Sequence, residues 1–166
     1  MKQDPFVLER TFKAPRALVW AAMSQAKHLA GWFSPAGMTA GKNEMDFREG
    51  GVYHYELIPS EGPAFWGRWI FRQIIDQKLI VNHVSFSDAD CGITRHPMAP
   101  DWPLETMSRT QFSDVEGGTL ICLEWSPIGS DAVANQAFTD GKPSMTQGWG
   151  GTMDKLDVYL AEVQNG

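Results

Sequence analysis

The sequence predicts an α+β fold in which an antiparallel β-sheet holds one long C-terminal helix around a cavity. Much of the chain from residue 43 alternates apolar and polar residues, as half-buried strands do. Near residue 148 the apolar period changes from two to about 3.6, which predicts an amphipathic helix. Its apolar face contains Trp149, Met153, Leu156, Leu160 and Val163. A tryptophan beside glycines begins this face, and the strands carry large aromatic residues, a combination that favours a cavity between sheet and helix.

The composition predicts one globular domain over residues 1–166, with 43% apolar and 20% charged residues. Its seven Trp, nine Phe and three Tyr residues fit either a filled core or a ligand cavity. A net charge of −6 without a basic stripe argues against nucleic acid and anionic membranes as partners. No apolar run is long enough to span a membrane, and Met1 to Pro5 contain no apolar signal region. We therefore expect a cytoplasmic protein.

The first thirty residues predict a strand followed by two short helices. Phe6 to Lys13 alternate as a strand does. Pro15 suits the first position of a helix. Ser24 can cap a second short helix that runs through Leu29 and ends at Gly31. This helical pair makes the connection between the first two strands a crossover.

The middle of the chain predicts antiparallel strands joined by short turns. The Gly-Gly pairs at 50–51 and 117–118 are typical of hairpin turns. We expect strands at residues 44–48, 52–58, 65–75, 79–86, 104–112 and 119–125. The 79–86 strand is apolar at nearly every position, as a central strand covered on both faces would be. Residues 87–103 form a long loop with three prolines, which is either disordered or functional, for example as a lid.

Two helical segments are predicted after the last strand. Ser130 can cap a short helical turn through Phe138, and the capping-box pattern of residues 144–147 places the start of the long helix near residue 145. Three glycines at 148, 150 and 151 follow, and each costs about 1 kcal/mol relative to Ala in a helix interior. Either the helix starts later, near Thr152, or the glycines let it approach the sheet closely or open for a ligand.

Several polar residues are predicted to face inward. Thr106, Ser108 and Thr110 share the inward side of the 104–112 strand. Because an unpaired buried hydroxyl costs about 1–3 kcal/mol, they either pair with neighbouring chain or line a cavity. His83, in an apolar strand, is either a buried, satisfied histidine or a hydrogen-bonding group in that cavity. Arg10 shares a side with apolar neighbours, so it needs a carboxylate partner if it points inward.

The sequence contains no motif that indicates catalysis, a cofactor or a metal. It has no nucleophile elbow, P-loop or dinucleotide-binding glycine motif. Cys91 and Cys122 form no C-x-x-C pair, and the spacing of Asp88, Asp90 and His96 matches no standard metal site. We therefore expect no catalytic residue, no cofactor and no metal ligand.

The order and spacing of residues along nearly the whole chain also carry a family resemblance. The residues concerned are Arg10–Pro15, Val19, Trp20, Ala22, Leu29, Trp32, Asp46, Arg48, Gly50, Gly51, Tyr53, Tyr55, Gly67, Leu79, Ile80, Gly117–Thr119, Gly148, Trp149, Leu156, Tyr159 and Leu160. In these the chain resembles homologues of the activator of the heat-shock-protein-90 ATPase, within the START, polyketide cyclase and birch-pollen-allergen-like (SRPBCC) superfamily. The resemblance implies a helix-grip fold: a curved antiparallel sheet around a long C-terminal α-helix, with two small helices after the first strand.

Together these observations predict a small hydrophobic-ligand binding protein, whose ligand is a small apolar or aromatic molecule or a lipid. The residues expected to contact it are Trp32, Tyr53, Tyr55, Trp69, Phe71, His83, Thr106, Ser108, Thr110, Ile121, Leu123, Trp125, Trp149 and Met153. Two alternatives stay open. One is a cyclase- or hydrolase-like enzyme that uses His83 or Tyr55 as acid or base. The other is a stress- or chaperone-related interaction protein that uses its outer surface. The sequence also leaves a homodimer open.

Overall fold

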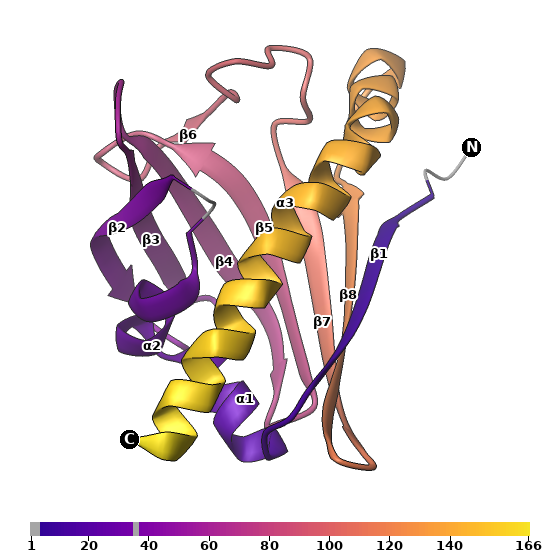
Figure 1. Ribbon diagram of the computed structural model, residues 1–166. Coiled ribbons are helices and arrows are strands. Elements are labelled where there is room, and N and C mark those ends of the chain that lie inside the picture. The colour runs from indigo at the N-terminus through magenta and orange to yellow at the C-terminus, as the bar shows by residue number, and fades with distance from the viewer. Residues whose placement is uncertain (1–3, 35–36) are drawn as a thin grey trace.

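A curled antiparallel sheet with one long helix across its face dominates the computed structural model, which describes residues 4–34 and 37–166 (Figure 1). Residues 1–3, part of the segment that the sequence analysis expected to contain no apolar signal region, lie outside the described residues. Two short helices follow the first strand and lie near the C-terminal part of the long helix (Figure 1). The predicted α+β class and helix-grip arrangement are confirmed.

The sheet follows the order β1-β8-β7-β5-β4-β3-β2, and each strand is antiparallel to its neighbours. Its strands are β1 (Phe6–Phe12), β2 (Met38–Met45), β3 (Val52–Pro59), β4 (Phe65–Ile75), β5 (Leu79–Ser87), β7 (Thr106–Val115) and β8 (Gly118–Pro127). A two-residue strand, β6 (Ile93–Thr94), pairs with β5. The helices are α1 (Arg16–Ser24), α2 (Ala26–Trp32) and α3 (Ala132–Asn165).

Most predicted strands lie within a few residues of their expected bounds, but β2 does not. It ends at Met45, where the sequence predicted a strand over 44–48. A register shift between Ala40 and Asn43 breaks its alternation, which explains the misplaced prediction. The following turn needs its glycines: Gly50 has a φ of 84°, and a Cβ on Gly51 would lie 2.0 Å from the carbonyl oxygen of Asp46.

The long helix α3 begins much earlier than predicted. The expected short helix at 130–138 and the long helix from about 145 are one continuous helix of 34 residues. Asp131 caps it, because its side chain accepts a 2.9 Å hydrogen bond from the backbone N–H of Ala134. Pro143 lies inside the helix, where it removes one backbone donor. The axis of α3 bends in its first half (Figure 1).

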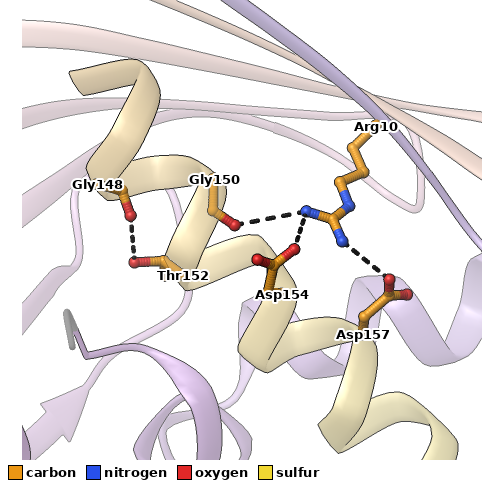
Figure 2. Close-up of polar contacts among 6 residues, drawn as sticks. All are labelled: Arg10, Gly148, Gly150, Thr152, Asp154 and Asp157. Atoms are coloured by element: carbon orange, nitrogen blue, oxygen red, sulfur yellow. Dashed lines mark hydrogen bonds and ion pairs between the residues drawn. The ribbon is translucent and has the colours of Figure 1, made fainter. Parts of the chain in front are cut away.

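The three glycines at 148, 150 and 151 lie within α3, so the alternative start near Thr152 is wrong. A Cβ added at any of them would meet nothing within 4 Å. They therefore do not serve a close approach of helix to sheet either. Thr152 donates a 3.0 Å hydrogen bond to the carbonyl oxygen of Gly148, a local contact that tends to bend helices (Figure 2).

The second half of α3 packs into the main core. Met153, Leu156 and Leu160 are fully buried there, as the predicted apolar face requires, and each contributes about 1.5–3 kcal/mol by burial. Val163, the last residue of that face, is instead 39% exposed. The first half of α3 contributes Phe138 and Met145 to a smaller buried cluster with Phe6 of β1.

An ion-pair cluster connects this helix to the edge strand β1. Arg10 contacts Asp154 at 2.7 Å and Asp157 at 2.9 Å, and its third contact is the carbonyl oxygen of Gly150 at 3.4 Å (Figure 2). The inward-facing arginine thus has the carboxylate partners that the sequence analysis required.

Within the described ranges, no helix is both long and apolar enough to cross a membrane.

Candidate functional site

A groove of about 710 Å³ lies between α3, the sheet and the loop after β6. We call it the outer groove. Its helical wall comes from the first half of α3, including Ala137, Gly141 and Met145. Its remaining lining residues are Phe33, Ser34, Leu57, Phe86, His96, Ala99, Pro100, Asp101, Trp102, Trp125, Ser144, Gly148, Trp149 and Thr152.

A second hollow of about 170 Å³, the inner cavity, lies deeper between the sheet and α3. Phe33, Trp125 and Trp149 line both spaces and so form their common boundary. The Trp149 ring lies 5.9 Å from that of Trp125 and 6.2 Å from that of Phe33, centroid to centroid. These three aromatic side chains therefore lie between the two spaces.

Most residues that the sequence analysis assigned to a ligand line this inner cavity. They are Trp32, Tyr55, Trp69, Ser108, Thr110, Ile121, Leu123, Trp125, Trp149 and Met153. Thr106 lines a neighbouring space of about 130 Å³ instead. Tyr53 and Phe71 are buried in the main core. The binding role of all these side chains stays a prediction.

His83 lies on the opposite face of the sheet from the cavity. Its neighbours Asn82 and Val84 both line the inner cavity, and side chains alternate along a strand. Burial and the nearby charge of Arg72 lower the pKa of His83, whereas Glu105 acts in the opposite direction. His83 is thus a partly covered residue of the outer sheet face.

The hydroxyl-bearing strand β7 faces inward, and its three hydroxyls differ in their surroundings. Thr106 accepts a 2.6 Å hydrogen bond from Nε1 of Trp125 and contacts the carbonyl oxygen of Val84 at 3.4 Å. Of the two possibilities raised by the sequence, Thr106 therefore takes the first: its hydroxyl pairs with neighbouring parts of the chain. Ser108 and Thr110 line the inner cavity.

Asn82 is a polar residue of the inner cavity that the sequence analysis missed. It lies on β5 directly opposite Ser108 of β7 and is only 4% exposed. Its Oδ1 atom has no hydrogen-bond partner among the described residues. The signal was weak, because a strand that is apolar at nearly every position does not reveal which face each residue takes.

The two tyrosines of β3 are neutral hydroxyl groups in an apolar surrounding. Their rings stack at 5.0 Å, and the Tyr53 hydroxyl donates to Oδ1 of Asn43. Burial raises the pKa of Tyr55 to about 12, although a hydrogen bond with Trp69 opposes this, and burial also raises that of Tyr53. Gly67 makes room for the Tyr55 ring, because a Cβ there would lie 2.4 Å from Tyr55 Cζ.

The second half of the 87–103 loop forms one wall of the outer groove. Trp102 packs 5.5 Å from Phe138 and 6.3 Å from Trp125, and His96 lies 4.5 Å from Phe86, between ring centroids. Burial lowers the pKa of His96. Sequence reasoning identified the loop but missed these residues, since a single Trp among prolines does not reveal its partners.

The first half of the same loop covers the outer face of the sheet. His54 of β3 is buried there and stacks on Trp66 at 5.0 Å between ring centroids. Its Nε2 lies 3.1 Å from the carbonyl oxygen of Asp88, a residue of this loop. In the described part of the chain, no three His, Cys, Asp or Glu side chains gather closely enough to hold a metal ion.

Comparison with known proteins agrees with this architecture. None of the curated proteins is similar enough in sequence to count as a match. A solution structure of a protein from Arthrobacter aurescens has a TM-score of 0.77 at 21% identity, covering 95% of this chain and 86% of that one. A crystal structure of a protein from Nitrosomonas europaea has a TM-score of 0.76 at 19% identity, covering 98% of this chain and 97% of that one. The crystal structure of the AHSA1 protein from Silicibacter pomeroyi has a TM-score of 0.69 at 18% identity, covering 95% of this chain and 97% of that one.

At such identities these structures show the fold alone. The family model "Activator of Hsp90 ATPase homolog 1-like protein" matches residues 13–161, which is most of the chain. The chain therefore belongs to the family of activator of Hsp90 ATPase homolog 1-like proteins.

Proposed function

We propose that this protein binds a small hydrophobic molecule between its sheet and α3. The observation that carries the proposal is the pair of adjoining spaces, an outer groove of about 710 Å³ and an inner cavity of about 170 Å³. Sites for small molecules are concave, mostly apolar and about 300–1,000 Å³ in volume. The fold of this family is compatible with such a role.

The walls supply the apolar surface that such a ligand needs. Aromatic rings from several separate elements converge on the inner cavity: Trp32 from α2, Tyr55 from β3, Trp69 from β4 and Trp149 from α3. Rings of this kind bury large areas and pack edge to face with a bound ring. The proposed ligand lies with one end in the inner cavity and the other in the outer groove.

The position of the ionisable groups favours binding over catalysis. Asp101 and His96 line the outer groove on its loop side. Among the described lining residues of the inner cavity, Tyr55 is the only one with an ionisable side chain. With a pKa raised by burial to about 12, Tyr55 is a poor proton acceptor at neutral pH. This supports a carrier or sensor that holds its ligand unchanged.

Native mass spectrometry of protein purified from its own host, together with calorimetry using 4-butylanisole as an apolar probe, tests the proposal. We expect a retained small molecule and micromolar probe binding. Ala137→Trp fills the outer groove and should weaken probe binding at least tenfold. Val158→Trp on α3, at a position 59% exposed and outside both linings, is the matched control and should bind normally.

The proposal fails if the wild-type protein retains no molecule and binds no probe. It also fails if Ala137→Trp binds the probe as tightly as Val158→Trp does.

A further inference from the structure

We infer that the ligand carries a neutral hydrogen-bond-donating head group, an alcohol or phenol hydroxyl, which the side-chain oxygen of Asn82 accepts at the floor of the inner cavity. This inference rests on the proposed function and specifies the chemistry of its ligand. Four observations support it: an unpaired acceptor, the hydroxyl groups beside it, described lining residues that include no Lys or Arg, and the size of the cavity.

The acceptor is Oδ1 of Asn82. It is buried, and no described residue donates to it. Its strand neighbours on the same face, Ile80 and Val84, are apolar and also line the cavity. Because leaving a buried acceptor unpaired is unfavourable, a ligand donor at this position pairs with an oxygen that no described protein group satisfies.

The neighbouring polar groups are hydroxyls. Ser108 lies directly opposite Asn82 across the β5–β7 ladder, and Thr110 is the next residue on the same face of β7. A hydroxyl both donates and accepts. A ligand hydroxyl that donates to Asn82 can therefore also accept from a serine or threonine, as a hydroxyl does in water.

The charges around the two spaces exclude an ionised head group. Within the described chain, neither lining contains a lysine or an arginine. A carboxylate or phosphate would lose its hydration there without a counter-charge. Among the described lining residues, Asp101 is the only acidic one and belongs to the outer groove, so an ammonium group would also lack a counter-charge in the inner cavity.

The volume fits a ring that carries this hydroxyl. An apolar cavity of about 150 Å³ accommodates benzene in another protein, and the inner cavity has about 170 Å³. The remainder of the ligand extends past the boundary aromatics Phe33, Trp125 and Trp149 into the outer groove.

Calorimetry with two matched probes tests the inference. 4-Butylphenol donates a hydrogen bond, whereas 4-butylanisole has the same ring and chain and only accepts. We expect the wild-type protein to bind the phenol about tenfold more tightly. Asn82→Leu should remove this preference while still binding the anisole. His83→Gln, the adjacent residue on the other face of the sheet, is the control and should keep the preference.

Two further measurements keep the inference testable even if Asn82→Leu does not fold. Asn82→Leu removes an unpaired polar group, so the empty variant should unfold at the same urea concentration as wild type or a higher one. In the wild-type protein, the side-chain amide NMR signals of Asn82 should shift with 4-butylphenol and much less with 4-butylanisole.

The possible outcomes separate the two proposals. If both probes bind the wild-type protein equally and the Asn82 amide signals respond alike, the inference is overturned and the proposed function stands. If neither probe binds and the purified wild-type protein retains no molecule, the proposed function itself fails.

Discussion

The indole nitrogen of Trp125 donates a 2.6 Å hydrogen bond to Oγ1 of Thr106, from β8 to the neighbouring strand β7. Trp125 lines the outer groove, the inner cavity and the smaller space beside them. The hydrogen bond therefore holds the ring that separates all three spaces. Thr106 thus fixes one wall residue of the outer groove and the inner cavity without lining either of them.

Replacing Thr106 by Val tests this relationship. The side chain keeps its shape, but the Trp125 N–H loses its acceptor, so the free energy of unfolding should fall by about 1–3 kcal/mol. Urea denaturation measures the loss. Thr106→Ser retains the hydroxyl and should lose much less. Equal stability of the Val and Ser variants would show that the hydrogen bond does not matter.

Replacing Gly148, Gly150 and Gly151 by Ala should stabilise the protein, because a Cβ at each position meets nothing within 4 Å and the helix already sets the backbone. The expected gain is about 0.4–1 kcal/mol per site, measured by urea denaturation. Gly141→Ala in the same helix is the control. Its Cβ would lie 2.8 Å from Trp102, so it should give a smaller gain or a loss and disturb the outer groove.

Arg10→Met should weaken the attachment of α3 to β1. Partial burial lowers the pKa of the Arg10 guanidinium, but Asp154 and Asp157 raise it by more, so the net shift is upward. Arg10 is therefore positively charged in the wild-type protein, and Arg10→Met removes that charge. A double-mutant cycle with Asp157→Asn should give a coupling of about 0.2–1 kcal/mol, which falls at high salt because these side chains are partly exposed. Arg48→Met, which removes an exposed pair with Asp46, should change stability less.

The imidazole of His28 should make stability depend on pH. Burial, and secondarily the charge of Lys27, lowers its pKa below the ordinary value of 6.5. As pH falls, the imidazole of His28 is therefore protonated in the unfolded chain before it is protonated in the folded protein. The stability that neutral His28 contributes is lost from about pH 6.5 down to the folded-state pKa.

A His28→Gln variant isolates that contribution. Its amide can still accept from the Tyr159 hydroxyl, which lies 2.5 Å from Nδ1 of His28, but it cannot titrate. Urea midpoints measured from pH 7.5 to 5 should fall less steeply for the variant. Parallel curves for the two proteins would contradict the assignment.

The architecture could be predicted because its signals are local. Alternation marks the strands, paired glycines mark two turns, and the spacing of Trp149, Met153, Leu156 and Leu160 marks the buried face of α3. Gly50 and Gly117 both have a φ of 84°, the positive value that the predicted turns require.

The start of α3 could not be predicted, because long-range packing there outweighs local propensity. Pro143 and three glycines indicate an interrupted helix. Phe138 and Met145, however, pack on Trp102 and Trp125, which are distant in sequence. Burial of these side chains keeps the segment helical on both sides of the proline.

The orientation of β5 was similarly hidden. A strand covered on both faces has no alternation, so the sequence analysis chose His83 as a cavity residue, whereas Asn82 lines the cavity. The buried state of His54 also depends on a distant segment, since the loop that contains Asp88 covers it.

The boundary between the outer groove and the inner cavity has an optical consequence. Trp32, Trp69, Trp125 and Trp149 all line the inner cavity, and Trp102 lines the groove beside it. An indole emits at shorter wavelength when an apolar neighbour replaces water. The rings that form the walls therefore make the intrinsic emission of this protein a label-free indicator of whether its interior is occupied.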